Sequence, residues 1–152
     1  MKRLWGALGL VLALSVFMPR VAEAQTSQDD GRVRRNGATL GQNYPNPFNP
    51  ETRIPFTVGD APTCSQPGKQ YRVSLKVYNV LSDVVATPVL QGGTSGVAGG
   101  QPLEKIAIPC GDYVAYWDGK VQATGREAAS GVYLYRLEVD GVPLVKKMIV
   151  VK

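Results

Sequence analysis

Two kinds of side chain in this sequence have the chemistry that active sites use: a pair of cysteines, Cys64 and Cys110, and a set of aspartates. The chain contains no histidine, which is the commonest general base and the commonest metal ligand in proteins. A catalytic thiol, or a metal held by the two cysteines, therefore has no support. An even number of cysteines in an exported protein favours a disulfide. If joined, Cys64 and Cys110 close a loop of about 47 residues, which would stabilise the fold by about 3 to 4 kcal/mol if the bond is unstrained.

The aspartates all lie next to turn signals: Asp83, Asp112, Asp118 and Asp140. Aspartate at such positions caps and closes the backbone. A paired-carboxylate site would need two of them to converge in a cleft, and a calcium loop would need a D-x-[DN]-x-[DN]-G array, which the sequence lacks. The glycine-rich stretch 91–100 has no lysine of the kind that phosphate-binding loops carry. We therefore expect a protein that is not an enzyme, with no cofactor, no metal site and no small-molecule substrate.

The first 24 residues have the order of a secretory signal peptide. A basic start precedes an apolar run from residue 4 to residue 18, and the small residues Ala22 and Ala24 form a cleavage signal before Gln25. The alternative is a membrane anchor, but the apolar run is shorter than the roughly 20 residues that span a bilayer. We expect cleavage before Gln25 and export to an oxidising compartment.

The remaining chain carries little net charge. Removal of the signal peptide takes the formal net charge from +5 to about +3. The basic residues are scattered, apart from a cluster at 32–35 and the pair Lys146 and Lys147, and no aromatic residues interleave with them. Nucleic-acid-binding surfaces gather positive charge on one face. We therefore expect no nucleic-acid partner.

A polar leader and a single domain follow the signal peptide. Residues 25–39 have almost nothing apolar to bury, so they are predicted to form a disordered leader. Residues 40–152 are long enough for one domain. The domain opens with the segment 40–50, which holds three prolines and three asparagines. Because proline fixes φ and asparagine favours turns, we expect a rigid, turn-rich segment pinned by Tyr44 and Phe48.

Alternation of apolar and polar residues predicts strands along the rest of the domain. The predicted strands are 52–58, 71–80, 84–89, 103–108, 112–117, 131–139 and 142–152. In 103–108 the alternation places Leu103, Lys105 and Ala107 on one face. The Asp140-Gly141 pair is a hairpin signal, and no stretch has sustained helical periodicity. These features predict an all-β fold, a two-layer antiparallel β-sandwich of about seven strands.

The last predicted strand ends in lysines around apolar residues. Lysine on an edge strand discourages the addition of further strands. The same strand could instead be a recognition surface that a receptor captures. The pattern alone favours edge protection and leaves recognition open.

Five stretches, taken in order, resemble the C-terminal sorting domains (type A) of type IX bacterial secretion. The most specific stretch is 40–54, with the motif Asn43, Tyr44, Pro45, Asn46, Pro47, Phe48, Asn49 and Pro50. The others are 73–81, where Ser82 follows in place of the family's usual glycine, the turn Trp117, Asp118 and Gly119, the strand 130–137 with Gly131 and Tyr133, and Lys146, Lys147 and Met148 with the final Lys152. The same module is similar to the Ig-like one in the flagellar hook-capping protein.

The resemblance implies an Ig-like β-sandwich whose last strand is read by outer-membrane secretion machinery after passage through the periplasm. The residues it implies for recognition are Lys146, Lys147, Met148, Lys152, Gly131 and Tyr133. It also implies an extracellular or cell-surface destination, where a sorting peptidase can remove such a domain. The alternative is a domain retained whole, as a structural or adhesive protein that associates with itself or with another surface protein. A small hydrolase is the third hypothesis, and it would need a concave site with a perturbed carboxylate pair.

Overall fold

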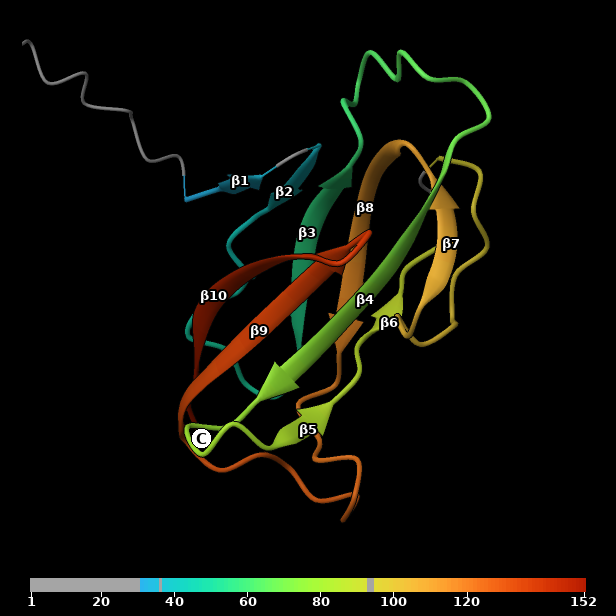
Figure 1. The fold of residues 1–152 in the computed structure, drawn as a ribbon. Helices are drawn as coiled ribbons and strands as arrows, with labels where there is room; N and C mark the ends of the chain where they lie inside the picture. Colours follow the sequence, from blue (N-terminus) through green and yellow to red (C-terminus); the bar gives the residue numbers. More distant parts are fainter. Residues whose placement is uncertain (1–30, 36, 93–94) are drawn as a thin grey trace, which may run out of the picture.

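A computed structural model of the chain describes residues 31–35, 37–92 and 95–152, and in these ranges it consists of strands, turns and loops without a helix. The expected signal peptide, with Ala22, Ala24 and Gln25, lies outside the described residues. Figure 1 shows two layers of strands, with β4, β9 and β10 in front of β3 and β8. Within the described ranges, no helix has the length and apolarity needed to cross a membrane.

Each layer is an antiparallel sheet. The first sheet has the order β1 (Val33–Arg35), β2 (Ala38–Leu40), β3 (Thr52–Val58), β8 (Gly111–Trp117) and β6 (Val89–Leu90). The second has the order β10 (Val142–Val150), β9 (Gly131–Val139), β4 (Gln70–Tyr78) and β5 (Val84–Ala86), with β7 (Ile106–Pro109) also paired to β4. The predicted all-β antiparallel sandwich is confirmed. Its long strands β3 and β9 have the predicted bounds, and β4, β8 and β10 differ from theirs by one or two residues at one or both ends.

The core lies between the two sheets and follows the period of two. In β3, Ile54, Phe56 and Val58 are buried, and in β9 Tyr135 and Leu137 are fully buried. The inward residues of β4 and β8 complete the same cluster. Burial of alternate apolar side chains from both sheets is what fixes each strand's face and register.

Three sequence-based expectations differ from the structure. The predicted disordered leader 25–39 is wrong for its second part, because β1 and β2 form a hairpin in which Ala38 is buried and pairs with Val58 of β3. The predicted strand 84–89 is two short strands, β5 in one sheet and β6 in the other. The predicted strand 103–108 begins only at Ile106, because Lys105 has a φ of 50° that breaks the extended backbone. Leu103 is therefore buried while Ala107 is exposed, contrary to the predicted shared face.

Candidate functional site: the last strand and its proline-rich clamp

Strand β10 forms one edge of the second sheet and pairs with β9 along its whole length. Its inward side chains include Leu144, Met148 and Val150, all buried. Lys146 also points to this side, is half-buried, and donates a hydrogen bond from Nζ to the carbonyl of Gly31. The outward side chains of β10 are exposed: Val145, Lys147 and Ile149. Met148, predicted from the resemblance as a recognition residue, is thus a core residue in this fold.

The segment Gln42–Pro50, which we call the proline-rich clamp, lies along the outer edge of β10. The amide of Phe48 donates to the carbonyl of Ile149 at 3.0 Å, and the carbonyl of Phe48 accepts from the amide of Val151 at 3.0 Å. The amide of Ile149 donates to Oδ1 of Asn46 at 2.9 Å. The clamp therefore occupies the backbone groups that the end of an edge strand would otherwise offer to another chain.

The rest of this edge is restricted as well. Gln42 donates from Nε2 to the carbonyl of Lys147 at 3.2 Å. Pro143, on the same strand, has no amide hydrogen to donate. Only the short stretch from Val145 to the amide of Lys147 lies between these two restrictions.

A buried polar cluster holds the start of the clamp on the core. The amide of Asn43 donates to the hydroxyl of Tyr135 at 3.1 Å, and that hydroxyl donates to the carbonyl of Gly41 at 2.8 Å. Asn43 also donates from Nδ2 to Oγ1 of Thr52 at 3.0 Å and to the carbonyl of Pro45 at 3.1 Å. Asn43 and Thr52 are the two buried polar residues among the described part of the chain. Burial raises the pKa of the Tyr135 hydroxyl far above its ordinary value, so this hydroxyl stays a hydrogen-bond donor.

An aromatic row holds the other end of the clamp. The rings of Phe48 and Trp117 meet edge to face at 5.4 Å between centroids, and the rings of Trp117 and Tyr133 do so at 5.9 Å. Gly119, at a φ of 75°, lies against the clamp so closely that a Cβ atom there would come within 1.9 Å of the carbonyl oxygen of Pro50. Only glycine can therefore occupy this turn while the clamp is in place.

The turn after β8 and the end of the chain complete the arrangement. Asp118 accepts the amide of Lys120 at 3.0 Å, and Trp117 donates from Nε1 to the carbonyl of Lys120 at 2.9 Å. The amide of Lys152 donates to Oγ of Ser130 at 3.0 Å, and its Nζ lies 3.6 Å from Oε2 of Glu127. Gly131 pairs with Val150 at the start of β9. The fold thus brings the proline-rich motif, the Trp117 turn and the Tyr133 strand together around the end of β10.

The residues of the clamp differ in burial. Phe48 and Asn43 are buried, whereas the exposed positions are Tyr44, Pro45, Asn46, Pro47, Asn49 and Pro50.

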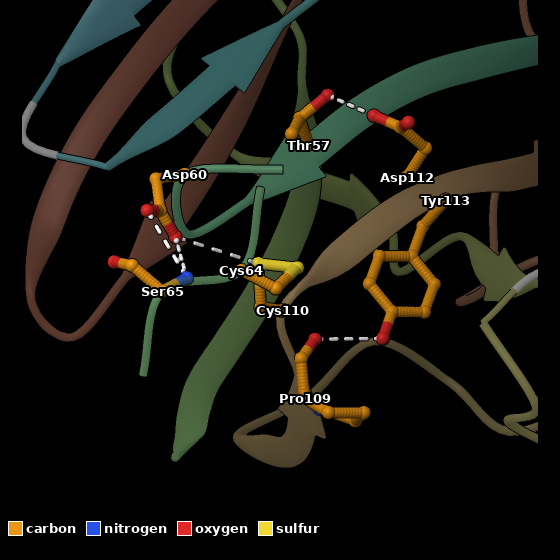
Figure 2. The surroundings of a disulfide bond; sticks show 8 residues. All are labelled: Thr57, Asp60, Cys64, Ser65, Pro109, Cys110, Asp112 and Tyr113. Atoms are coloured by element: carbon orange, nitrogen blue, oxygen red, sulfur yellow. Dashed lines mark hydrogen bonds between the residues drawn. A yellow bond between two sulfur atoms is a disulfide. The ribbon is translucent and has the colours of Figure 1, made fainter. Parts of the chain in front are cut away.

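The predicted disulfide is confirmed, and it lies at the opposite end of β3 from the clamp. Cys64 and Cys110 are bonded, with their Cα atoms 5.6 Å apart, and both are half-buried. Figure 2 shows the loop beside them, in which the amide of Ser65 donates to both carboxylate oxygens of Asp60 at 3.1 and 3.2 Å. Hydrogen bonding from Ser65, through its side chain first and its amide second, holds the pKa of Asp60 below its usual value. The bond ties the loop after β3 to the start of β8.

Each of the turn aspartates accepts a hydrogen bond from a different residue. Asp140 accepts the amide of Arg72 at 2.8 Å, Asp112 accepts the hydroxyl of Thr57 at 2.6 Å, and Asp83 accepts Nδ2 of Asn79 at 3.2 Å. In the described ranges, no group of three or more histidine, cysteine or acidic side chains has the arrangement of a metal site.

Sequence reasoning missed the apolar outer face of β9 and β10. Val132 is 45% exposed, Leu134 39%, Val145 47% and Ile149 38%. The signal was present in the sequence, because 131–139 carries apolar residues at both phases of its alternation in its first half.

Comparison with known proteins finds no matching family model, no matching curated protein and no matching solved structure.

Proposed function

We propose that this protein is a non-catalytic sorting module, exported across the outer membrane by a type IX-like secretion system that recognises the end of β10. The observation that carries the proposal is the clamp itself. Four of the five stretches of the motif resemblance meet around the end of β10, through the clamp hydrogen bonds, the aromatic row and the glycine of the Trp117 turn. The fifth stretch, 73–81, lies in β4 and the turn after it, and β4 pairs with β9. A set of motifs that meets around one strand is what a signal presented by that strand requires.

Only some of the residues implied by the resemblance are accessible to a receptor. A folded domain presents surface side chains, and of the residues implied by the resemblance Lys147 and Lys152 are exposed whereas Met148 and Tyr133 are buried. In the proposal, the buried residues shape the end of the sandwich and the exposed lysines meet the outer-membrane machinery or a sorting peptidase. The clamp gives the receptor one fixed arrangement of β10 rather than a fraying strand.

The test is export of the full chain from a bacterium that has a type IX system, compared with the same strain after the system is inactivated. We expect the protein outside the cell or on its surface in the first strain, and in the periplasm in the second. An unchanged distribution between the two strains would refute the proposal.

Mass spectrometry of the exported protein separates the two fates of the domain. A chain that begins at Gln25 and is cut near the domain boundary supports removal by a sorting peptidase. An intact chain from Gln25 to Lys152 outside the cell supports a domain retained as a surface module.

A further inference from the structure

We propose that the receptor binds the outer face of β9 and β10, through an apolar protein surface that carries a carboxylate opposite Lys147. We call this face the terminal patch: Val132, Leu134, Val145, Lys147 and Ile149. The inference rests on the proposed function and names the part of the domain that is read. It excludes recognition by addition of a strand to the edge of β10.

The register places these side chains side by side on one face. Ile149 is opposite Val132, and Lys147 is opposite Leu134, so two rows of the patch cross both strands. Directly opposite residues of an antiparallel pair lie about 5 Å apart, which makes the patch continuous. Val145 extends it along β10 on the far side of Lys147. Four of the five side chains are apolar and each is more than a third exposed.

The outer face of the other sheet has a different character. There, outward side chains interact with one another across β3 and β8. The guanidinium of Arg53 lies 5.9 Å from the centroid of the Tyr116 ring, and the hydroxyl of Thr57 donates to Asp112 at 2.6 Å. None of the large, exposed hydrophobic side chains in the described part of the chain lies on this outer face of β3 and β8. Within the strands of the described ranges, four of the five large exposed hydrophobic side chains lie on the face of β9 and β10, and the fifth is Val84 of β5. A continuous exposed apolar patch of this kind is typical of interaction surfaces.

The edge of β10 is a poor alternative to its face. Strand addition needs a row of free amides and carbonyls. The clamp occupies the amide and carbonyl of Ile149 and the amide of Val151, and Gln42 donates to the carbonyl of Lys147. A receptor that docks on the face leaves all of these hydrogen bonds intact.

The positive charge of Lys147 indicates the kind of partner that would bind the terminal patch. The other cations near the patch are neutralised, since Arg136 lies 3.0 Å from Glu138 and Lys76 lies 3.0 Å from Glu104. Lys147 makes no ion pair with any described residue. A second copy docked by a two-fold axis on this patch would bring two Lys147 side chains together, and like charges repel. A partner surface with a carboxylate between apolar side chains would bury the apolar residues of the patch and form an ion pair with Lys147.

The experiment uses the same export assay with single variants of the full chain. We expect Lys147→Glu to lower the exported fraction by about tenfold or more, because a buried like-charge contact costs more than 1.4 kcal/mol of binding. Lys147→Arg should export normally, and Leu134→Ser should lower export. The matched controls are Lys69→Glu, which makes the same charge change near the disulfide, and Val114→Ser on the outer face of β8. Both controls should export like the unmodified chain.

Thermal unfolding of each purified variant checks that the fold is kept. If folded Lys147→Glu and Leu134→Ser export normally from a strain in which export of the unmodified chain requires the system, the patch is not the docking surface and the proposed function stands. If export of the unmodified chain does not require the system, the proposed function itself fails. Sedimentation of the unmodified chain tests whether a second copy of the chain binds the terminal patch. A dimer that Leu134→Ser abolishes would assign the patch to self-association and overturn the inference.

Discussion

At the scale of single residues, Tyr135 links the core of the second sheet to the proline-rich clamp. Its hydroxyl accepts from the amide of Asn43 and donates to the carbonyl of Gly41. Both partners come from the backbone that precedes β3, whereas Tyr135 lies in the middle of β9. One phenolic oxygen therefore satisfies two backbone groups that the clamp carries into the interior, where unpaired groups are costly.

Replacement of Tyr135 by phenylalanine should lower the free energy of unfolding by about 1 to 3 kcal/mol, because both backbone groups lose their partner. The pH dependence should change as well. Burial raises the pKa of the Tyr135 hydroxyl, so above pH about 10 the hydroxyl ionises in the unfolded chain before it does in the folded one. Its contribution to stability is thus complete below pH about 10 and falls as the pH rises. Urea unfolding of both proteins at several alkaline pH values should give a shallower decline for Tyr135→Phe, and parallel declines would contradict this role.

Ser82 shows how a single position can be understood from sequence and structure together. The resemblance has glycine here, and the structure places Ser82 at a φ of 67°, a region that favours glycine. The turn is nevertheless closed by Asn79, whose Oδ1 accepts the amides of Leu81 and Asp83. The backbone strain at Ser82 can be seen only in the structure.

At the scale of elements, the long strands were predictable and the short ones were not. Strands β3 and β9 have the predicted bounds because apolar residues recur at every second position along them and become the inward residues. β1 and β2 escaped prediction because three residues are too few for a pattern. They are stabilised instead by pairing, β2 with β3 and β1 with β2. The clamp was predicted as a turn-rich segment pinned by Tyr44 and Phe48. Phe48 is buried as expected, whereas the side chain of Tyr44 is exposed, so it does not pin the segment to the core. Its position on the edge of β10 was not predictable, because no local pattern records a contact about a hundred residues away.

The clamp is held on β10 in part by the side chain of Asn46. We expect Asn46→Ala to speed hydrogen exchange of the Ile149 amide by about tenfold and to lower the free energy of unfolding by about 0.5 to 1.5 kcal/mol, since that amide loses its acceptor. Asn49→Ala is the matched control, because the Asn49 side chain is exposed and forms no hydrogen bond with any described residue. Equal exchange at Ile149 in both variants would show that the clamp does not depend on this contact.

At the scale of the whole molecule, the sandwich is closed differently at its two ends. One end of β3 leads to the disulfide loop, and the other lies beside the clamp and the Trp117 turn (Figure 1). A covalent bond closes the first end, whereas hydrogen bonds and aromatic packing close the second. The end with the proposed receptor surface is therefore the one that can open locally without breaking a covalent bond.

The disulfide should stabilise the whole sandwich without shaping the receptor end. Its cysteines are 46 positions apart, and opening that loop in the unfolded chain should cost about 3 to 4 kcal/mol of stability. We expect Cys64→Ala/Cys110→Ala to lower the urea midpoint accordingly, and reduction of the unmodified chain to give the same shift. Exchange at the Ile149 amide below the unfolding transition should be as slow as in the unmodified chain, because no hydrogen bond joins the clamp to the disulfide loop within the described residues. An unchanged urea midpoint would mean that the loop between the two cysteines is already compact in the unfolded chain. Faster hydrogen exchange of the Ile149 amide well below the transition would mean that the two ends of the sandwich are coupled through β3.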